Sequence, residues 1–306
     1  MQPLILHHYE LSPFSKKIRA IFGYTQLPWQ SAITKEMPPR PVLSHLTGGY
    51  RKIPVAQQGA DVFCDTRIIC AEIAAITQKQ ELDVFTSEQA IQDFVSVADS
   101  QAFFAGLTQT LTWKMNKIVL QSMSLKDVYL FLKDRIAMGR SMNTQLQSPK
   151  QSKIFFSQYL QQLENQLETD FLFGDKPTIA DFSAYHILWL IRAKAENKQL
   201  AQYTRLNQWL DSMDGFGEGP ATPMDPQAAL STALNSEPRA IPSDQKQHPD
   251  VGKTVTIAPS DYGLNPSQGV LEASSDYRWI ISREDSQVGR VHVHFPKQGF
   301  ELKVVG

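Results

Sequence analysis

Near its N-terminus the chain passes from an apolar run through a turn into an amphipathic segment, LILHHYELSPFSKKIRAIFGY. The run Pro3–His8 predicts a buried strand, and Pro13–Tyr24 predicts a helix because its apolar residues recur at helical spacing. Proline suits the first helical position, where its missing N–H has no partner, and Ser12 suits the N-cap before it. Some folds place a Cys-x-x-Cys pair at such a turn for redox chemistry, but here the two positions hold Ser12 and Ser15.

The segments that follow continue this alternation of strands and helices. Trp29–Thr34 predicts a second short strand, and a Pro-rich loop with a short helical stretch comes after it. Ile53–Gln57 and Asp61–Cys64 predict a hairpin, after which Asp65 begins another helix. The order strand–helix–strand–helix–strand–strand–helix is the connectivity of a thioredoxin-like domain, which we expect over residues 1–80.

The second part of the chain, residues 87–213, is predicted to be all helix. The Thr178-Ile-Ala-Asp181 segment indicates a capping box, in which the threonine oxygen accepts a free N–H and the acid reaches back. The other helices are expected from Ser87 towards Met115, from Ser124 towards Met142, from Pro149 to about Leu172, and over about Gln199–Met213.

Glycine and proline in GFGEGPATPMDP indicate a break, followed by a linker over 214–250 with one short helix near Gln227–Leu234. Residues 251–306 predict a small antiparallel β-barrel or sheet, packed on the helical domain and without a catalytic group of its own. Its expected strands are Thr254–Ala258, Gly269–Ala273, Tyr277–Arg283, Arg290–Phe295 and Phe300–Val305. The predicted fold class is thus α/β plus all-α plus small β.

Composition excludes several classes of protein. A net charge of −1 and the lack of a long basic run give no support for a nucleic-acid partner. No apolar run approaches the roughly 20 residues that a membrane-spanning helix needs, and we expect no export signal. Cys64 and Cys70 are the chain's two cysteines, so we expect no disulfide framework and a reducing compartment. The expected protein is soluble, cytoplasmic and not bound to a membrane.

Four motifs, taken in order, resemble a glutathione S-transferase (GST). They are the Ser-Pro-Phe-Ser turn, the Lys-Ile-Pro-Val segment, Asp65-Thr66 at a helix start, and Thr-Ile-Ala-Asp in the helical domain. The turn is most similar to that of the omega-like branch, whose Cys-Pro-Phe forms mixed disulfides with glutathione. Here Ser12 replaces that cysteine. The resemblance implies a thioredoxin-like domain followed by a GST-type helical domain, with glutathione as co-substrate, a homodimer, and a role in detoxification.

Asp65 and Thr66 are candidate residues for the γ-glutamyl end of glutathione. They stand where a strand feeds a helix N-terminus, and free N–H groups at the positive end of a helix dipole suit an α-carboxylate. The Thr66 hydroxyl adds a donor, and Asp65 could accept from the ammonium of the same arm. The alternative is that both residues only cap the helix.

The rest of glutathione is assigned to three residues. The resemblance implies a cis peptide bond before Pro54, so that the N–H and C=O of Ile53 bind the cysteinyl portion like an added strand. The alternative is a trans proline at a strand start. The resemblance places Arg40 near the glycyl carboxylate, which a guanidinium can bind with two parallel N–H bonds. A solvated loop arginine is the alternative, and Arg51 and Lys52 are nearby competitors.

Ser12 is the first candidate for the catalytic group. A free thiol has a pKa of about 8.5, and a hydroxyl at a helix start can donate a hydrogen bond to a bound thiolate. The turn would thereby keep the thiol of glutathione ionised without forming a covalent bond to it. Ser15 and Tyr9 are the second and third candidates, and a simple N-cap role for Ser12 is the alternative.

Two function classes remain open. The first is an enzyme that activates the glutathione thiol for attack on an apolar electrophilic small molecule. The second is a glutathione-binding or protein-interaction scaffold with a GST fold and little or no turnover. No metal is expected, because His292 and His294 lack the accompanying ligands of a zinc site and are more typical of a surface pair.

Overall fold

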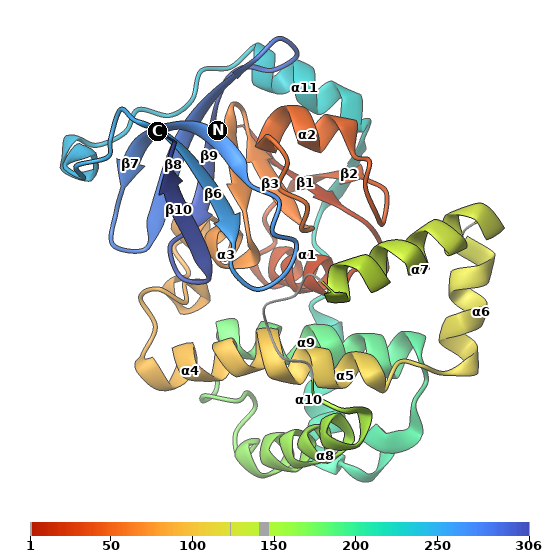
Figure 1. Ribbon diagram of the computed structural model, residues 1–306. Coiled ribbons are helices and arrows are strands. Elements are labelled where there is room, and N and C mark those ends of the chain that lie inside the picture. The colour runs from red at the N-terminus through yellow and green to blue at the C-terminus, as the bar shows by residue number, and fades with distance from the viewer. Residues whose placement is uncertain (1, 123, 141–146, 306) are drawn as a thin grey trace.

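The computed structural model describes residues 2–122, 124–140 and 147–305. Its N-terminal part has the predicted thioredoxin-like order of strands and helices (Figure 1). The elements are β1 (Leu4–His8), α1 (Pro13–Thr25), β2 (Trp29–Ile33), α2 (Pro41–Thr47), β3 (Val55–Gln58), β4 (Asp61–Cys64) and α3 (Thr66–Thr77). As predicted, Ser12 is the N-cap of α1 and Pro13 is its first residue.

Helices make up the second part of the chain. They are α4 (Gln89–Val97), α5 (Phe103–Thr108), α6 (Trp113–Ser122), α7 (Leu125–Arg140), α8 (Pro149–Gln166), α9 (Ile179–Trp189) and α10 (Thr204–Gly215). The helix predicted from Ser87 to Met115 is divided into α4, a π-helical turn and α5, and α6 begins separately. The capping box at Thr178 and Asp181 is confirmed, whereas the expected helix end at Met142 lies outside the described residues. None of the helices in the described ranges is long and apolar enough to cross a membrane.

The C-terminal part supplies further strands. Its elements are β5 (Ala221–Met224), α11 (Pro226–Leu234), β6 (Thr254–Pro259), β7 (Ser267–Ser274), β8 (Arg278–Asp285), β9 (Gly289–Pro296) and β10 (Phe300–Val304). All the strands predicted after residue 251 are present, and α11 forms where a short helix was expected. Strand β5 was not predicted, because Ala221–Met224 contains a proline and has no alternation of apolar residues.

The described strands form one ten-stranded sheet in the order β10-β6-β7-β8-β9-β4-β3-β1-β2-β5. Strand β9 pairs in parallel with β4, and β5 pairs in parallel with β2. The expectation that the C-terminal strands pack on the helical domain is therefore wrong in its main point, because they extend the N-terminal sheet instead. Contact with the helices is made by rings such as Tyr262, which packs edge-on against Phe104 of α5.

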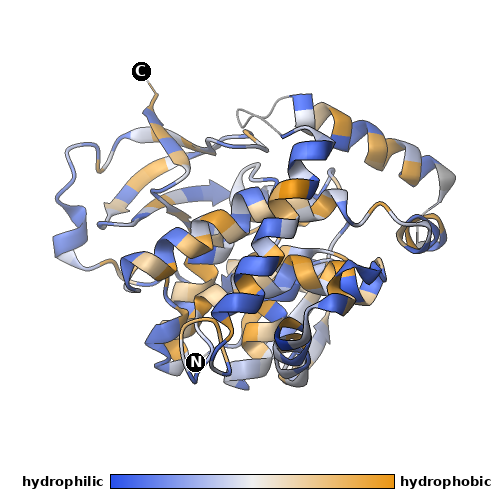
Figure 2. Ribbon diagram, turned by 90° about the horizontal axis from the view of Figure 1, so that it is seen from below, coloured by the Kyte–Doolittle hydropathy of each residue, from blue (hydrophilic) through white to orange (hydrophobic). Residues whose placement is uncertain are grey.

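The two larger hydrophobic clusters of the described residues lie on opposite faces of the sheet. On one face, α1 and α3 pack with the helical part, so that one buried cluster runs from Leu4 and Phe22 to Tyr185 and Trp209. On the other face, α2 and α11 cover the C-terminal strands, and Tyr50 and Phe295 belong to the same buried cluster. Figure 2 shows helices on which hydrophobic and hydrophilic residues alternate along the ribbon, as expected of amphipathic helices. The C-terminal strands thus share a core with N-terminal elements.

A buried polar network joins β4 to β9. Asp61 of β4 is 1% exposed, and its carboxylate accepts hydrogen bonds from His294 Nε2 at 2.9 Å and from the Arg239 backbone N–H at 3.0 Å. The Arg239 guanidinium also pairs with Glu72 of α3, which Arg278 of β8 approaches at 3.4 Å. Burial alone would raise the pKa of Asp61, but the bonds from His294 and Arg239 lower it below its ordinary value. His294 is therefore part of a structural ion network and not of a surface pair.

We expect Asp61→Asn to lower the free energy of unfolding by about 2 kcal/mol. The substitution leaves Arg239 without one of its carboxylates, and the cost is moderated because the Arg239 side chain is 47% exposed. Urea unfolding at neutral pH measures the effect. Asp276→Asn, in an exposed turn of the same sheet, is the matched control and should change stability by less than about 0.5 kcal/mol. Equal stabilities for the two variants would contradict the proposed role of the network.

Buried histidines make the fold sensitive to acid. Burial lowers the pKa of His7, His8, His186 and His294 from 6.5 to about 4. The unfolded chain takes up protons on these residues below its ordinary histidine pKa, whereas the folded chain does so only near pH 4. The unfolded state therefore binds more protons between these values, and stability falls as the pH drops from about 6.5 towards 4.

His186 offers a test of this pH dependence, because its ring lies among aromatic rings, 4.7 Å from Phe14 and 5.5 Å from Phe103 between centroids. The free energy of unfolding falls between about pH 7.5 and pH 5. We expect this fall to be about 2 kcal/mol smaller in His186→Phe than in the parent protein. Urea unfolding at both pH values gives this difference directly. An unchanged difference would mean that His186 does not contribute to acid sensitivity.

Candidate functional site

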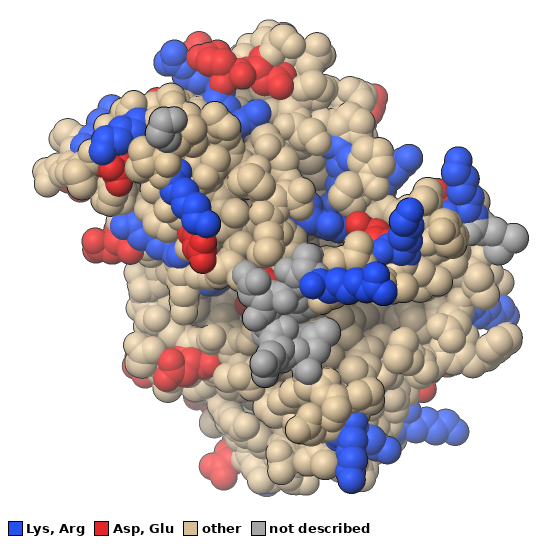
Figure 3. Space-filling model, viewed as in Figure 1, with Lys and Arg blue, Asp and Glu red and all other residues tan. Residues whose placement is uncertain are grey.

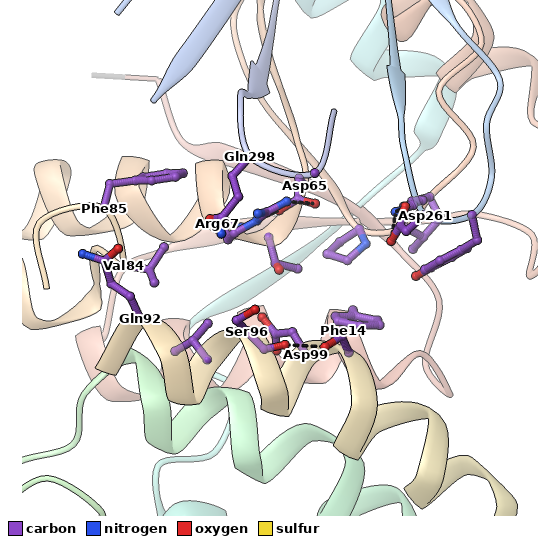
Figure 4. A pocket seen from close by; sticks show the side chains of 18 of the residues that line it. Phe14, Asp65, Arg67, Val84, Phe85, Gln92, Ser96, Asp99, Asp261 and Gln298 are labelled. Atoms are coloured by element: carbon purple, nitrogen blue, oxygen red, sulfur yellow. Dashed lines mark hydrogen bonds and ion pairs between the residues drawn. The ribbon is translucent and has the colours of Figure 1, made fainter. Parts of the chain in front are cut away.

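A cavity of about 280 Å³ lies where the N-terminal, helical and C-terminal parts meet (Figure 4). Three groups of residues line it. The N-terminal part supplies Phe14, Tyr50, Lys52, Ile53, Pro54, Asp65, Thr66 and Arg67. The helical part and the loop before it supply Val84, Phe85, Gln92, Val95, Ser96, Asp99 and Ser100. The C-terminal part supplies Asp261, Tyr262, Gln298 and Gly299.

The N-terminus of α3 forms one side of this cavity. Asp65 is the N-cap, with a φ of 76°, and its side chain accepts a hydrogen bond from the Arg67 N–H at 3.0 Å. Its carboxylate also pairs with the Arg67 guanidinium at 2.9 Å. Burial would raise the pKa of Asp65, but Arg67 lowers it below its ordinary value, so the carboxylate is charged. Thr66 lines the cavity, and its hydroxyl has no hydrogen-bond partner among the described residues.

The segment before β3 forms the adjoining side. The peptide bond between Ile53 and Pro54 is cis, as predicted. Both residues line the cavity, and within the described part of the chain no hydrogen bond is made by the Ile53 backbone. A ligand with an extended backbone could therefore bind to the N–H and C=O of Ile53 beside the start of α3.

Ion pairs balance the charge around the cavity. Lys52 Nζ lies 2.6 Å from Asp261 Oδ1 and 4.0 Å from the centre of the Tyr262 ring. Burial lowers the pKa of Lys52, although Asp261 opposes this effect. On the helical side, Asp99 Oδ2 pairs at 2.7 Å with Lys17, which is fully buried behind it. The other oxygen, Asp99 Oδ1, is buried and has no hydrogen-bond partner in the described ranges. The lining therefore offers groups of both signs.

The predicted catalytic hydroxyls are not part of the cavity lining. Ser12 is 2% exposed, and its Oγ accepts a hydrogen bond from the Ser15 N–H at 3.2 Å. Ser15 is fully buried, and its own Oγ has no partner among the described residues. Tyr9 is half-buried. None of these three residues lines the cavity, whereas Phe14, between the two serines, does.

Arg40 also lies outside the cavity lining. It is 8% exposed, and its guanidinium donates to the carbonyls of Lys35 at 2.8 Å and Arg51 at 2.5 Å. Burial, together with the nearby guanidiniums of Arg135 and Arg51, lowers its pKa to about 10. The structure thus brings Ile53, Pro54, Asp65 and Thr66 together, and leaves Ser12, Ser15, Tyr9 and Arg40 outside the lining of this cavity.

Sequence reasoning missed several of the lining residues. Arg67 and Asp99 lie on helices, and no local motif marks them as facing a cavity. Asp261 and Tyr262 come from the β6–β7 loop, and Gln298 comes from the β9–β10 turn. Their position depends on how the C-terminal strands join the sheet, so no spacing within the sequence could reveal it. Across the described residues, no group of three or more His, Cys, Asp or Glu side chains could hold a metal ion.

The protein is of the class in which a thioredoxin-like α/β part is followed by a helical part, with a cavity where the two meet. Comparison with known proteins gives the family. The model of the glutathione S-transferase N-terminal domain matches residues 6–80, and that of the C-terminal domain matches residues 141–215. A search of curated proteins gave no match.

Solved structures agree with the family models. A GST-like protein from Pseudomonas syringae is 30% identical, with a TM-score of 0.80 and 100% of both chains covered. The apo form of a glutathione S-transferase III is 16% identical, with a TM-score of 0.51, and the match covers 78% of this chain and 100% of that one. The second likeness concerns the fold alone. The chain belongs to the glutathione S-transferase superfamily.

Proposed function

We propose that this protein is a glutathione transferase, which binds glutathione in the cavity and activates its thiol for attack on an apolar electrophilic small molecule. The observation that carries the proposal is the pair of unused backbone and hydroxyl groups at Ile53 and Thr66, which face one cavity beside the N-terminus of α3. The volume of about 280 Å³ lies just below the range of roughly 300–1,000 Å³ that is typical of small-molecule pockets, so the cavity suits a small ligand.

The polar groups of the cavity complement glutathione from end to end. The α3 N-terminus and the Thr66 hydroxyl suit the α-carboxylate of the γ-glutamyl arm. Asp99 lines the cavity and supplies negative charge for its ammonium, and Asp65, although paired with Arg67, adds negative charge nearby. The backbone of Ile53, before Pro54, suits the cysteinyl portion. Lys52 lines the cavity and is the proposed cation for the glycyl carboxylate. Arg40 is not part of the lining and would contact only a ligand that extends beyond the cavity.

Ser12 is the proposed activating group. It caps α1, where the helix N–H groups and the dipole favour negative charge. Because its oxygen accepts from the Ser15 N–H, its own hydroxyl hydrogen is available to a thiolate. Ser15 and Tyr9 remain the second and third candidates. The likeness of the Ser-Pro-Phe-Ser turn to the omega-like branch stays a prediction.

A scaffold with little or no turnover is the second candidate function. The observation that favours it is the burial of both serines, 2% and 0% exposed, outside the lining of the cavity. A protein that binds glutathione but shows no conjugation with a panel of aryl halides and other electrophiles would support this alternative.

The family also leads us to propose a homodimer in a reducing, cytoplasmic compartment, with a role in detoxification. Cys64 and Cys70 are both free and buried, in accordance with such a compartment. Charged side chains of both signs are scattered over the face drawn in Figure 3, in keeping with a small-molecule substrate. Light scattering after size exclusion tests the dimer, and a monomeric mass would exclude it.

We expect Thr66→Val to raise the Kd of glutathione about tenfold. The substitution keeps the shape of the side chain but removes a donor to the γ-glutamyl carboxylate, and a hydrogen bond to a charged group contributes about 1.5 kcal/mol or more. Isothermal titration calorimetry measures the change. Thr77→Val, at the other end of α3, removes a hydroxyl that donates to the Ile73 carbonyl and is the matched control. A wild-type affinity in Thr66→Val would show that the hydroxyl does not contact the ligand.

We expect Ser12→Ala to lower kcat with a generic aryl halide roughly ten- to a hundredfold at neutral pH. The loss of a preorganised donor raises the pKa of the bound thiol, while the helix N–H groups remain. Glutathione affinity should change little. Thiolate absorbance of bound glutathione as a function of pH gives the pKa, and thermal unfolding shows how much stability the lost N-cap costs.

Ser15→Ala and Tyr9→Phe complete this experiment. If Ser12→Ala leaves both the rate and the thiol pKa unchanged, the assignment to Ser12 is wrong, and whichever of the other variants raises the pKa identifies the activating group. If every variant matches an inactive parent that still binds glutathione, the scaffold is the correct function.

A further inference from the structure

The C-terminal strands extend the sheet and also contribute residues to the cavity. Two of their loops reach the cavity: the β6–β7 loop supplies Asp261 and Tyr262, and the β9–β10 turn supplies Gln298 and Gly299. The loops are joined to each other, because the Ser260 N–H donates to the Gly299 carbonyl at 3.0 Å. They therefore form a continuous outer wall of the cavity.

This wall is fixed to both of the other parts of the chain. The ion pair between Asp261 and Lys52 ties it to the segment before Pro54. On the helical side, the Tyr262 ring packs edge-on against Phe104 of α5 at 5.7 Å between centroids. Both contacts are made within the chain, so the wall is held against the N-terminal part and the helical part alike.

The β9–β10 turn lies directly on Arg67. A Cβ placed on Gly299, whose φ is +75°, would be 3.4 Å from Arg67 Nη2. The Gln298 side chain lies beside Arg67 and Asp65 in Figure 4, across the pocket from Ser96 and Asp99. Its amide makes no hydrogen bond within the described part of the chain and is exposed at the rim of the cavity.

We propose that the C-terminal strand region is part of the ligand site, with the Gln298 amide N–H₂ donating to the α-carboxylate of the γ-glutamyl group next to Thr66 and Arg67. This inference rests on the proposed binding of glutathione. Arg67 contributes positive charge, since Nε and Nη2 donate to Asp65 while Nη1 has no partner among the described residues. The Gln298 amide lies beside the N-terminus of α3 and adds a further donor to the carboxylate site.

Calorimetry with two probes tests the inference. The probes are S-hexylglutathione and S-hexylcysteinylglycine, which share the alkyl chain and differ by the γ-glutamyl group. We expect Gln298→Ala to raise the Kd of S-hexylglutathione about tenfold, which corresponds to one hydrogen bond to a charged group, and to leave that of S-hexylcysteinylglycine within about twofold. Gln298→Glu should weaken S-hexylglutathione further, because it opposes one carboxylate with another.

Gln287→Ala is the matched control, since Gln287 is an exposed glutamine on the β8–β9 turn of the same sheet and does not line the cavity. It should bind both probes as the parent does. An unchanged Kd in Gln298→Ala, or an equal loss for both probes, overturns the assignment of Gln298 to the γ-glutamyl group. If the parent itself fails to bind glutathione and S-hexylglutathione, the proposed function fails, and the inference fails with it.

Discussion

The parallel pairing of β4 with β9 is the contact on which the rest of the structure depends. Without β9, β4 would be the edge of the N-terminal sheet, with unpaired N–H and C=O groups. Strand β9, more than 200 residues later in the chain, covers that edge, and the buried carboxylate of Asp61 bonds to His294 across the junction. The pairing also fixes the loops after β6 and β9, because both belong to the same continuous sheet. The fold of the C-terminal part and the shape of the cavity are therefore consequences of one strand junction.

Local patterns predicted the elements well but not their long-range pairing. Apolar periodicity, a proline at the start of α1 and a capping box at Thr178 act within a few residues, and each is found as expected. The alternation of Val291, Val293 and Phe295 predicts a half-buried strand, but it is equally compatible with a separate barrel and with an extension of another sheet. The partner of β9 is determined by tertiary packing, for which a single sequence carries no local signal.

The same distinction applies to the site. Ile53, Pro54, Asp65 and Thr66 were predicted because each belongs to a short motif at a strand or helix end, and all four line one cavity. Gln298 stands in a turn whose sequence indicates only a turn. His294 was mistaken for half of a surface pair, because alternation places it on the face opposite to the apolar residues without revealing that α3 and Asp61 cover that face. Cavity-lining residues were thus predicted where their position follows from local backbone geometry, and missed where it depends on distant segments coming together.

The charges around the cavity indicate what kind of ligand it can accept. Asp65 is paired with Arg67, Asp99 with Lys17 and Asp261 with Lys52, so each lining carboxylate already has a cation. A ligand with a single charge would be attracted by one member of each ion pair and repelled by the other. A ligand with separated carboxylate and ammonium groups can place its carboxylate near the cation of one pair and its ammonium near the carboxylate of another. Because the pairs form within the chain, the cost of desolvating these side chains is largely met in folding, and the ligand need only replace water at the remaining donors and acceptors. A zwitterionic peptide satisfies this requirement better than a simple anion, which is a physical reason, independent of the family, for the proposal that glutathione binds here.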